Sequence, residues 1–72
     1  MNTPHYSMNI IWDDEDKIFV VTVPELDGCM THGKTYEEAV KNGEDAINGW
    51  IEVAQQLGWP LPQPRNYSDT AA

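Results

Sequence analysis

The first part of the chain alternates between apolar and polar positions. Every second residue from Tyr6 to Trp12 is apolar, which predicts a strand with one buried face. The run Lys17–Val23 is rich in β-branched residues and predicts a second strand. The four acids Asp13–Asp16 separate the two runs and suit a turn, because Asp side chains accept hydrogen bonds from nearby amides. The pattern therefore predicts an antiparallel hairpin.

A short turn and a third strand follow. Pro24 has no amide donor and closes the second strand, and Gly28 can adopt a positive φ in the turn after it. Cys29–Gly33 is then a third, short strand. Strands connected this closely form an antiparallel meander.

From Thr35 the apolar period lengthens to three and four residues. Thr35 and Glu38 have the spacing of a capping box, and apolar residues at helical spacing continue to Leu57. Gly58 fits the left-handed position after a helix, and Pro60 prevents its resumption. These signals predict one long helix over residues 36–57.

Two glycines lie inside this predicted helix, and each lowers its stability by about 1 kcal/mol relative to alanine. Gly43 falls on the apolar face, where a missing side chain lets a strand or a helix approach closely. Gly49 falls on the solvent side, and the sequence offers no reason for it.

The predicted fold is α+β, with a three-stranded antiparallel sheet and one long helix packed on one face. Residues 6–64 form a single domain, residues 1–5 a flexible lead-in and residues 65–72 a short tail with a disordered end. A short fourth strand at Arg65–Tyr67 is left open.

Composition narrows the class of protein. The chain has 72 residues and one cysteine, Cys29, so it builds a small core without an intramolecular disulfide, and such cores often gain stability by oligomerisation. A single thiol fits a reducing compartment. The sequence has neither a signal peptide nor a membrane-spanning run, and we expect a cytoplasmic protein.

The charge balance is strongly acidic. Twelve acidic against four basic residues give a net charge of −8, which argues against direct nucleic-acid binding because phosphate contacts depend on Lys and Arg. A basic protein partner is the natural counterpart, and an ordinary acidic surface is the simpler alternative.

No metal site is expected. The cluster Asp13–Asp16 lacks the alternating ligands and the central glycine of a calcium loop, so it is a solvated turn. His5, Cys29 and His32 match no zinc-ligand spacing.

No catalytic site is expected either. Cys29 and His32 are three positions apart on a strand and point to opposite faces. Glu25 and Asp27 could act as a general acid and base, but nothing in the sequence raises either pKa. The chain is predicted not to be an enzyme and to need no cofactor.

The three tryptophans differ in their expected roles. Trp50 belongs to the apolar face of the helix, and core packing is favoured for Trp12. Trp59 follows the helix and is equally compatible with core packing and with an interface.

The stretch Val23–Ala39 reads V-P-E-L-D-G-C-x-T-H-G-x-T-x-E-E-A and resembles the HicB-type antitoxin family. Asn42 and the alternating first strand also fit, and the resemblance covers about residues 6–64. It implies a partial, degraded RNase H-like fold. Antitoxins of this family bind a small basic ribonuclease toxin through the N-terminal domain and block its catalytic histidine or its RNA surface.

The chain departs from the family in one respect, and a second feature argues against residual nuclease activity. The eight residues after Pro64 are too few for the C-terminal DNA-binding domain of full antitoxins, so no direct DNA binding is expected. The predicted strands carry almost no acids, so the carboxylates that an RNase H needs for its two metals cannot be placed.

The sequence thus predicts an antitoxin-like protein that sequesters a small basic HicA-like ribonuclease toxin. The expected contacts are acidic residues and one exposed aromatic: Asp13, Asp14, Glu15, Asp16, Glu25, Asp27 and Trp59. The main alternative is a stand-alone homo-oligomer, a homodimer or larger, paired through the edge of the first or third strand. A minimal metal-dependent nuclease is less favoured.

Overall fold

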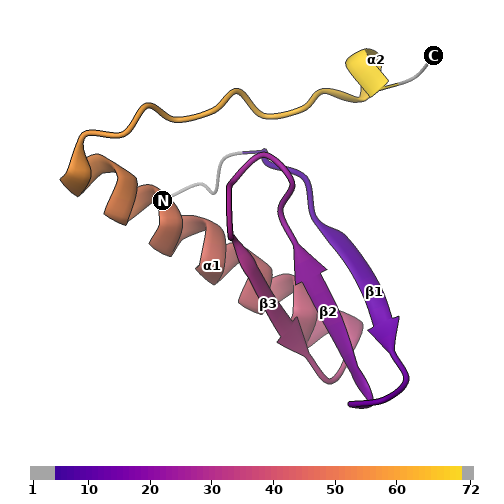
Figure 1. The fold of residues 1–72 in the computed structure, drawn as a ribbon. Coiled ribbons are helices and arrows are strands. Elements are labelled where there is room, and N and C mark those ends of the chain that lie inside the picture. Colours follow the sequence, from indigo (N-terminus) through magenta and orange to yellow (C-terminus); the bar gives the residue numbers. More distant parts are fainter. Residues whose placement is uncertain (1–4, 71–72) are drawn as a thin grey trace.

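The computed structural model describes residues 5–70, which form one antiparallel sheet and one long helix (Figure 1). The strands are β1 (Asn9–Asp13), β2 (Ile18–Thr22) and β3 (Met30–Gly33), in the order β1-β2-β3. Helix α1 (Tyr36–Leu57) follows, and α2 (Tyr67–Thr70) is a single turn near the end. The predicted α+β class is confirmed. The kinship with RNase H-like folds stays a prediction.

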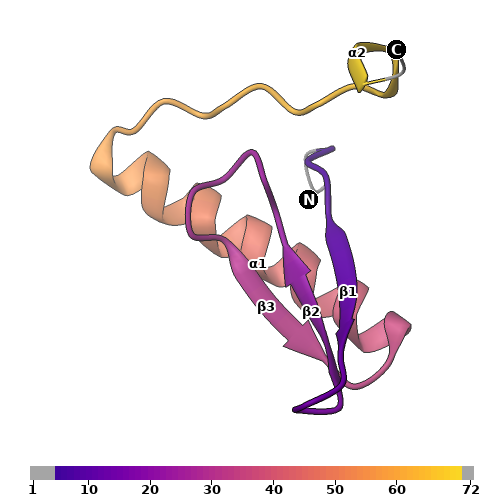
Figure 2. The ribbon, with the colours of Figure 1, turned by 45° about the vertical axis from the view of Figure 1, so that its right-hand side comes forward.

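Helix α1 covers one face of the sheet and contacts β2 and β3 (Figures 1 and 2). Val21 is on the covered face and is fully buried, whereas Ile11 is on the other face and is 67% exposed. Ile11 pairs with Val20, which pairs with His32, so this row crosses the open face. Within residues 5–70 no helix or strand covers that face.

The loop between β2 and β3 completes the core. The Leu26 amide donates to the Val23 carbonyl at 3.1 Å, and the Cys29 amide donates to the Leu26 carbonyl at 3.0 Å. These bonds turn the Leu26 side chain inward, where it is only 1% exposed and packs with Val23, Cys29 and Ile47. Because a fully buried Leu contributes about 2 kcal/mol, this residue ties the loop to α1.

Helix α1 begins and ends at the predicted residues. The Glu38 amide donates to Thr35 Oγ1 at 3.0 Å, and the Glu38 carboxylate reaches back to the Lys34 amide at 2.9 Å. At the other end Gly58 has φ 72°, and the Trp59 amide donates to the Ala54 carbonyl at 2.8 Å. Both termini are therefore capped by the residues that the pattern indicated.

Two glycines allow α1 to lie close to the sheet. A Cβ at Gly33 would lie 2.5 Å from the Ala39 nitrogen and 2.7 Å from its Cα, so the first turn of the helix touches the backbone of β3. A Cβ at Gly43 would lie 2.6 Å from Met8 Sδ. The predicted close approach at Gly43 is confirmed, and Gly33 is a second and tighter contact.

After α1 the chain returns in an extended segment across the end of the molecule that holds the β2–β3 loop (Figures 1 and 2). Tyr6 Oη donates to the Pro62 carbonyl at 2.6 Å. The Glu25 carboxylate accepts from the Arg65 amide at 2.9 Å and from the amide and hydroxyl of Ser7. One side chain thus joins the N-terminal segment, the loop and the tail.

The optional fourth strand at 65–67 does not form. Arg65 and Asn66 belong to the extended segment, and Tyr67 already begins α2. The three prolines of this segment have no amide donors, and the Arg65 amide is bonded to a side chain rather than to a strand. Most of the predicted lead-in (1–4) and the last two residues (71–72) lie outside the described residues.

We predict that Gly33→Ala destabilises the chain by about 3 kcal/mol, because its Cβ would meet backbone atoms that cannot move without shifting α1. Gly43→Ala should cost less, because the flexible end of Met8 can move aside and alanine favours the helix. Urea unfolding measures both. Equal stabilities of the two variants would contradict the tight contact at Gly33.

We also predict that acid weakens the tether formed by the hydrogen bonds from Ser7 and Arg65 to the Glu25 carboxylate. Burial alone raises the pKa of Glu25, but the hydrogen bonds from Arg65 and Ser7 outweigh it and hold the pKa below its ordinary 4.5. The stabilisation is therefore complete above pH 4.5 and is lost as the pH falls through the lowered pKa.

The test compares the wild type with Glu25→Gln in urea unfolding across this pH range. The control is Glu44→Gln, at an exposed position of α1. The gap in unfolding free energy between wild type and Glu25→Gln should shrink with acid. A gap that does not depend on pH would show that the Glu25 charge is not part of the tether.

Candidate functional site

The predicted contact residues do not form one surface. The β1–β2 turn with Asp13–Asp16 lies at one end of the sheet, and the β2–β3 loop with Glu25 and Asp27 lies at the other (Figure 2). Trp59 follows α1 and belongs with the loop, where its ring lies near Trp50. The predicted meander already implies this split, because successive turns of a meander lie at opposite ends of the sheet.

At the hairpin end, two of the four acids are engaged within the turn. Asp13 Oδ1 accepts from the Glu15 amide at 3.0 Å and from the Asp16 amide at 3.4 Å. Asp14 forms an exposed ion pair with Lys17 at 2.8 Å, which together with the Trp12 indole lowers the pKa of Asp14. Within residues 5–70 the Glu15 and Asp16 side chains form no hydrogen bond or ion pair, so they are available to a partner.

Aromatic side chains lie beside this turn. Trp12 meets the edge of Phe19 with ring centroids 5.0 Å apart, and Phe19 stacks on Tyr36 at 4.3 Å. Trp12 remains 46% exposed and Tyr36 67% exposed. The core assignment of Trp12 is therefore wrong in part, because the ring lies at the margin of the core.

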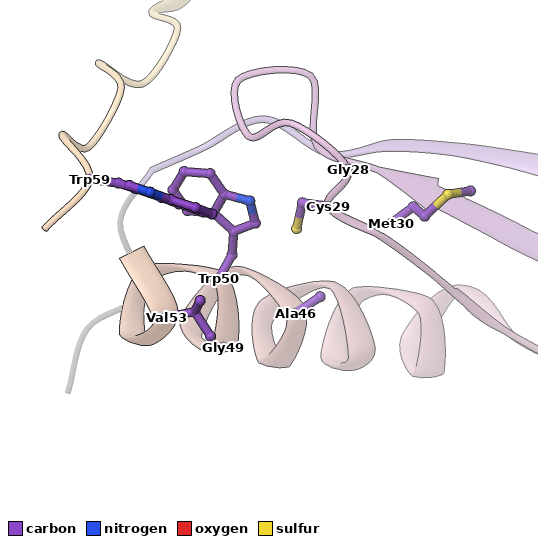
Figure 3. Close-up of a pocket in the computed structure, with 8 residues that line it drawn as sticks. All are labelled: Gly28, Cys29, Met30, Ala46, Gly49, Trp50, Val53 and Trp59. Atoms are coloured by element: carbon purple, nitrogen blue, oxygen red, sulfur yellow. The ribbon is translucent and has the colours of Figure 1, made fainter. Parts of the chain in front are cut away.

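At the other end, an open groove of about 290 Å³ runs between the start of β3 and the second half of α1 (Figure 3). We call it the tryptophan groove. Its lining is apolar and comes from three separate parts of the chain: Gly28, Cys29, Met30, Ala46, Gly49, Trp50, Val53 and Trp59. The rings of Trp50 and Trp59 are 6.0 Å apart, and Trp59 is 50% exposed.

The structure places Gly49 in the lining of the groove, which the sequence does not reveal. A Cβ at Gly49 would meet no heavy atom within 4 Å, and this residue lines the groove from the helix side. Any larger side chain there would project into open space. The signals that could have located the groove were an unexplained glycine inside a helix and an aromatic residue after its end.

The acids at this end have different surroundings. The Glu25 carboxylate is engaged by Ser7 and Arg65, so its part in partner binding stays a prediction that its geometry does not favour. Asp27 is exposed, and its carbonyl accepts from the Trp50 indole at 3.0 Å. This bond fixes the Trp50 ring at the wall of the groove.

The one cysteine does not meet a histidine. Cys29 is buried, and burial raises its pKa, which keeps the thiol protonated at neutral pH. His32 is exposed on the other face of β3, and its carbonyl accepts from Asn42 Nδ2 at 2.7 Å. The prediction that the two side chains point apart is confirmed.

Among residues 5–70, no group of three or more His, Cys, Asp or Glu side chains is placed to hold a metal ion. None of the helices in the same part of the chain combines the length and the apolar character that crossing a bilayer requires.

Comparison with known proteins shows which family this chain resembles. Residues 6–72 match the family model described as "HicB_like antitoxin of bacterial toxin-antitoxin system". A UPF0150 protein of Thermoplasma acidophilum is 44% identical over 54 residues, covering 75% of this chain and 78% of the relative. A UPF0150 protein of Archaeoglobus fulgidus is 38% identical over 48 residues, covering 67% of this chain and 70% of the relative. A UPF0150 protein of Helicobacter pylori is 38% identical over 44 residues, 61% of each chain.

The family match spans all three strands, α1 and the tail, so it is not confined to one motif. The chain belongs to the HicB-like antitoxin family of bacterial toxin–antitoxin systems.

Proposed function

We propose that this chain is an antitoxin that binds a small basic HicA-like ribonuclease toxin and covers its active site or its RNA-binding surface. The family match over residues 6–72 is the observation that carries the proposal. A protein that acts by covering another needs a complementary surface and no chemistry of its own. In this account the chain is not an enzyme, and the complex forms in the cytoplasm, where the toxin would meet RNA.

The charge of the chain supports this partner. A ribonuclease holds the phosphates of RNA with Lys and Arg, and a protein with net charge −8 competes for the same positive surface. Glu15 and Asp16 extend this negative field at the hairpin end, where both are exposed. Exposed charges act over roughly 8–10 Å at physiological salt, so they speed encounter even where they do not touch the toxin.

A second candidate function is a stand-alone homo-oligomer. The open face of the sheet favours it, because Ile11 and Met30 are 67% and 61% exposed there and exposed apolar patches often mark interfaces. A dimer that persists when a basic ribonuclease is added, without loss of RNA cleavage, would support this candidate over the first.

RNA cleavage tests the main proposal. The probe is any small basic protein that an adjacent gene encodes, purified and assayed on RNA with increasing amounts of the chain. The lack of such a gene would favour the stand-alone homo-oligomer. We expect cleavage to stop near one equivalent and to stay blocked at higher RNA concentration. Cleavage unaffected by a tenfold excess of the chain, or a neighbouring protein without ribonuclease activity, would contradict the proposal.

Charge reversal tests the electrostatic part. We predict that Asp14→Lys and Glu15→Lys each weaken toxin binding by about fivefold at low salt, with a smaller loss at high salt, because screening already removes the attraction. The control is Glu44→Lys, which makes the same charge change at an exposed position of α1 and should have a smaller effect. Titration calorimetry at two salt concentrations measures all three. Unchanged affinity in both hairpin variants would remove this part of the model.

A further inference from the structure

The tryptophan groove opens along one of the two outer edges of the sheet, that of β3. β3 is the last strand in the order β1-β2-β3, so its outer side has no neighbouring strand among the described residues. The His32 carbonyl points to that side, because it accepts from Asn42. Residues two apart on a strand direct their backbone groups the same way, so Met30 presents its N–H and C=O along the same edge, where the groove begins.

The groove is preorganised for one apolar side chain. The Trp50 ring is held by the Asp27 carbonyl at 3.0 Å, and the Trp59 backbone is held by the Ala54 carbonyl at 2.8 Å. Gly49 lines the groove from the helix beside Val53 (Figure 3), and a Cβ there would meet no heavy atom within 4 Å. Aromatic walls around an open space are typical of the anchor pockets that dominate binding energy at interfaces.

The rim of the groove is acidic. Asp45 precedes Gly49 by four residues and Glu52 follows it by three, so both lie on the same side of α1 as Gly49. Both are exposed, and so is Asp27, which lies in the β2–β3 loop on the other side of the groove. The lining residues include no Lys or Arg. The groove therefore favours a positively charged chain over a second copy of this acidic protein.

We propose that the tryptophan groove receives an extended segment of the toxin, which pairs with the edge of β3 at Met30 and places one apolar side chain over Gly49. Lys or Arg residues beside that side chain face Asp27, Asp45 and Glu52. Strand addition at a sheet edge supplies main-chain hydrogen bonds, and the pocket supplies specificity. This inference rests on the proposed function and names the surface through which it works.

Gly49→Leu tests the pocket directly, because the new side chain fills the space that the anchor needs. Leucine favours the helix over glycine by about 1 kcal/mol, and no neighbouring atom blocks its Cβ, so the variant should be at least as stable as the wild type. The matched control is Asn48→Leu, which is exposed and lies about 100° around α1 on the side away from Trp50.

Binding of the same basic ribonuclease is measured by calorimetry for the three chains, with circular dichroism and urea unfolding to verify the fold. We expect Gly49→Leu to lose at least tenfold in affinity and Asn48→Leu to stay within twofold of the wild type. The double variant Asp45→Asn/Glu52→Gln should bind the ribonuclease more weakly at low salt, and its affinity should depend less on salt.

The contrary outcomes separate the two proposals. Equal binding by all three chains, or equal loss in both leucine variants, overturns the groove and leaves the antitoxin function standing. No binding by any chain overturns both. An Asp45→Asn/Glu52→Gln variant with wild-type affinity and salt dependence overturns the basic segment as occupant. If the wild-type chain without toxin sediments as a dimer and the Gly49→Leu variant sediments as a monomer, the groove binds a second copy of this chain instead.

Discussion

The contact between the first turn of α1 and Gly33 sets the geometry of the whole chain. No Cβ fits between β3 and Ala39, so the helix lies directly on the sheet at this end. Small residues fill part of the interface, and Ala39 and Ala54 are fully buried there together with the larger Ile47. Because the domain is small and has no disulfide, it depends on this dense packing for its stability. The helix then extends past the start of β3, and its second half forms one wall of the tryptophan groove.

The local elements could be predicted because their signals are local. The bounds of α1 follow from a capping residue at Thr35 and a left-handed glycine at Gly58, and each works through bonds to residues a few positions away. The opposite directions of Cys29 and His32 follow from the alternation of a strand. The arrangement of three strands and one helix needed only the order of these elements and their short connections.

The site could not be predicted in the same way, because it depends on contacts between distant residues. The tryptophan groove joins Met30, Gly49 and Trp59, which have no common motif. The separation of Asp14 and Asp27 is an exception, because the predicted meander already places their two turns at opposite ends of the sheet. The course of the tail depends on Glu25, which accepts from Ser7 and Arg65 across 18 and 40 residues of sequence. The prolines indicate only that the tail lacks donors.

We propose that the toxin is attracted over a long range by the acidic hairpin and is then held by short-range contacts in the tryptophan groove. The most direct test is a map of amide and indole NMR signals of this chain with and without the basic ribonuclease. We expect the largest changes at residues 28–32, at Gly49 and at the indoles of Trp50 and Trp59, with slowed amide exchange at Met30. Changes confined to β1 and the open face of the sheet, with the groove signals unmoved, would contradict it.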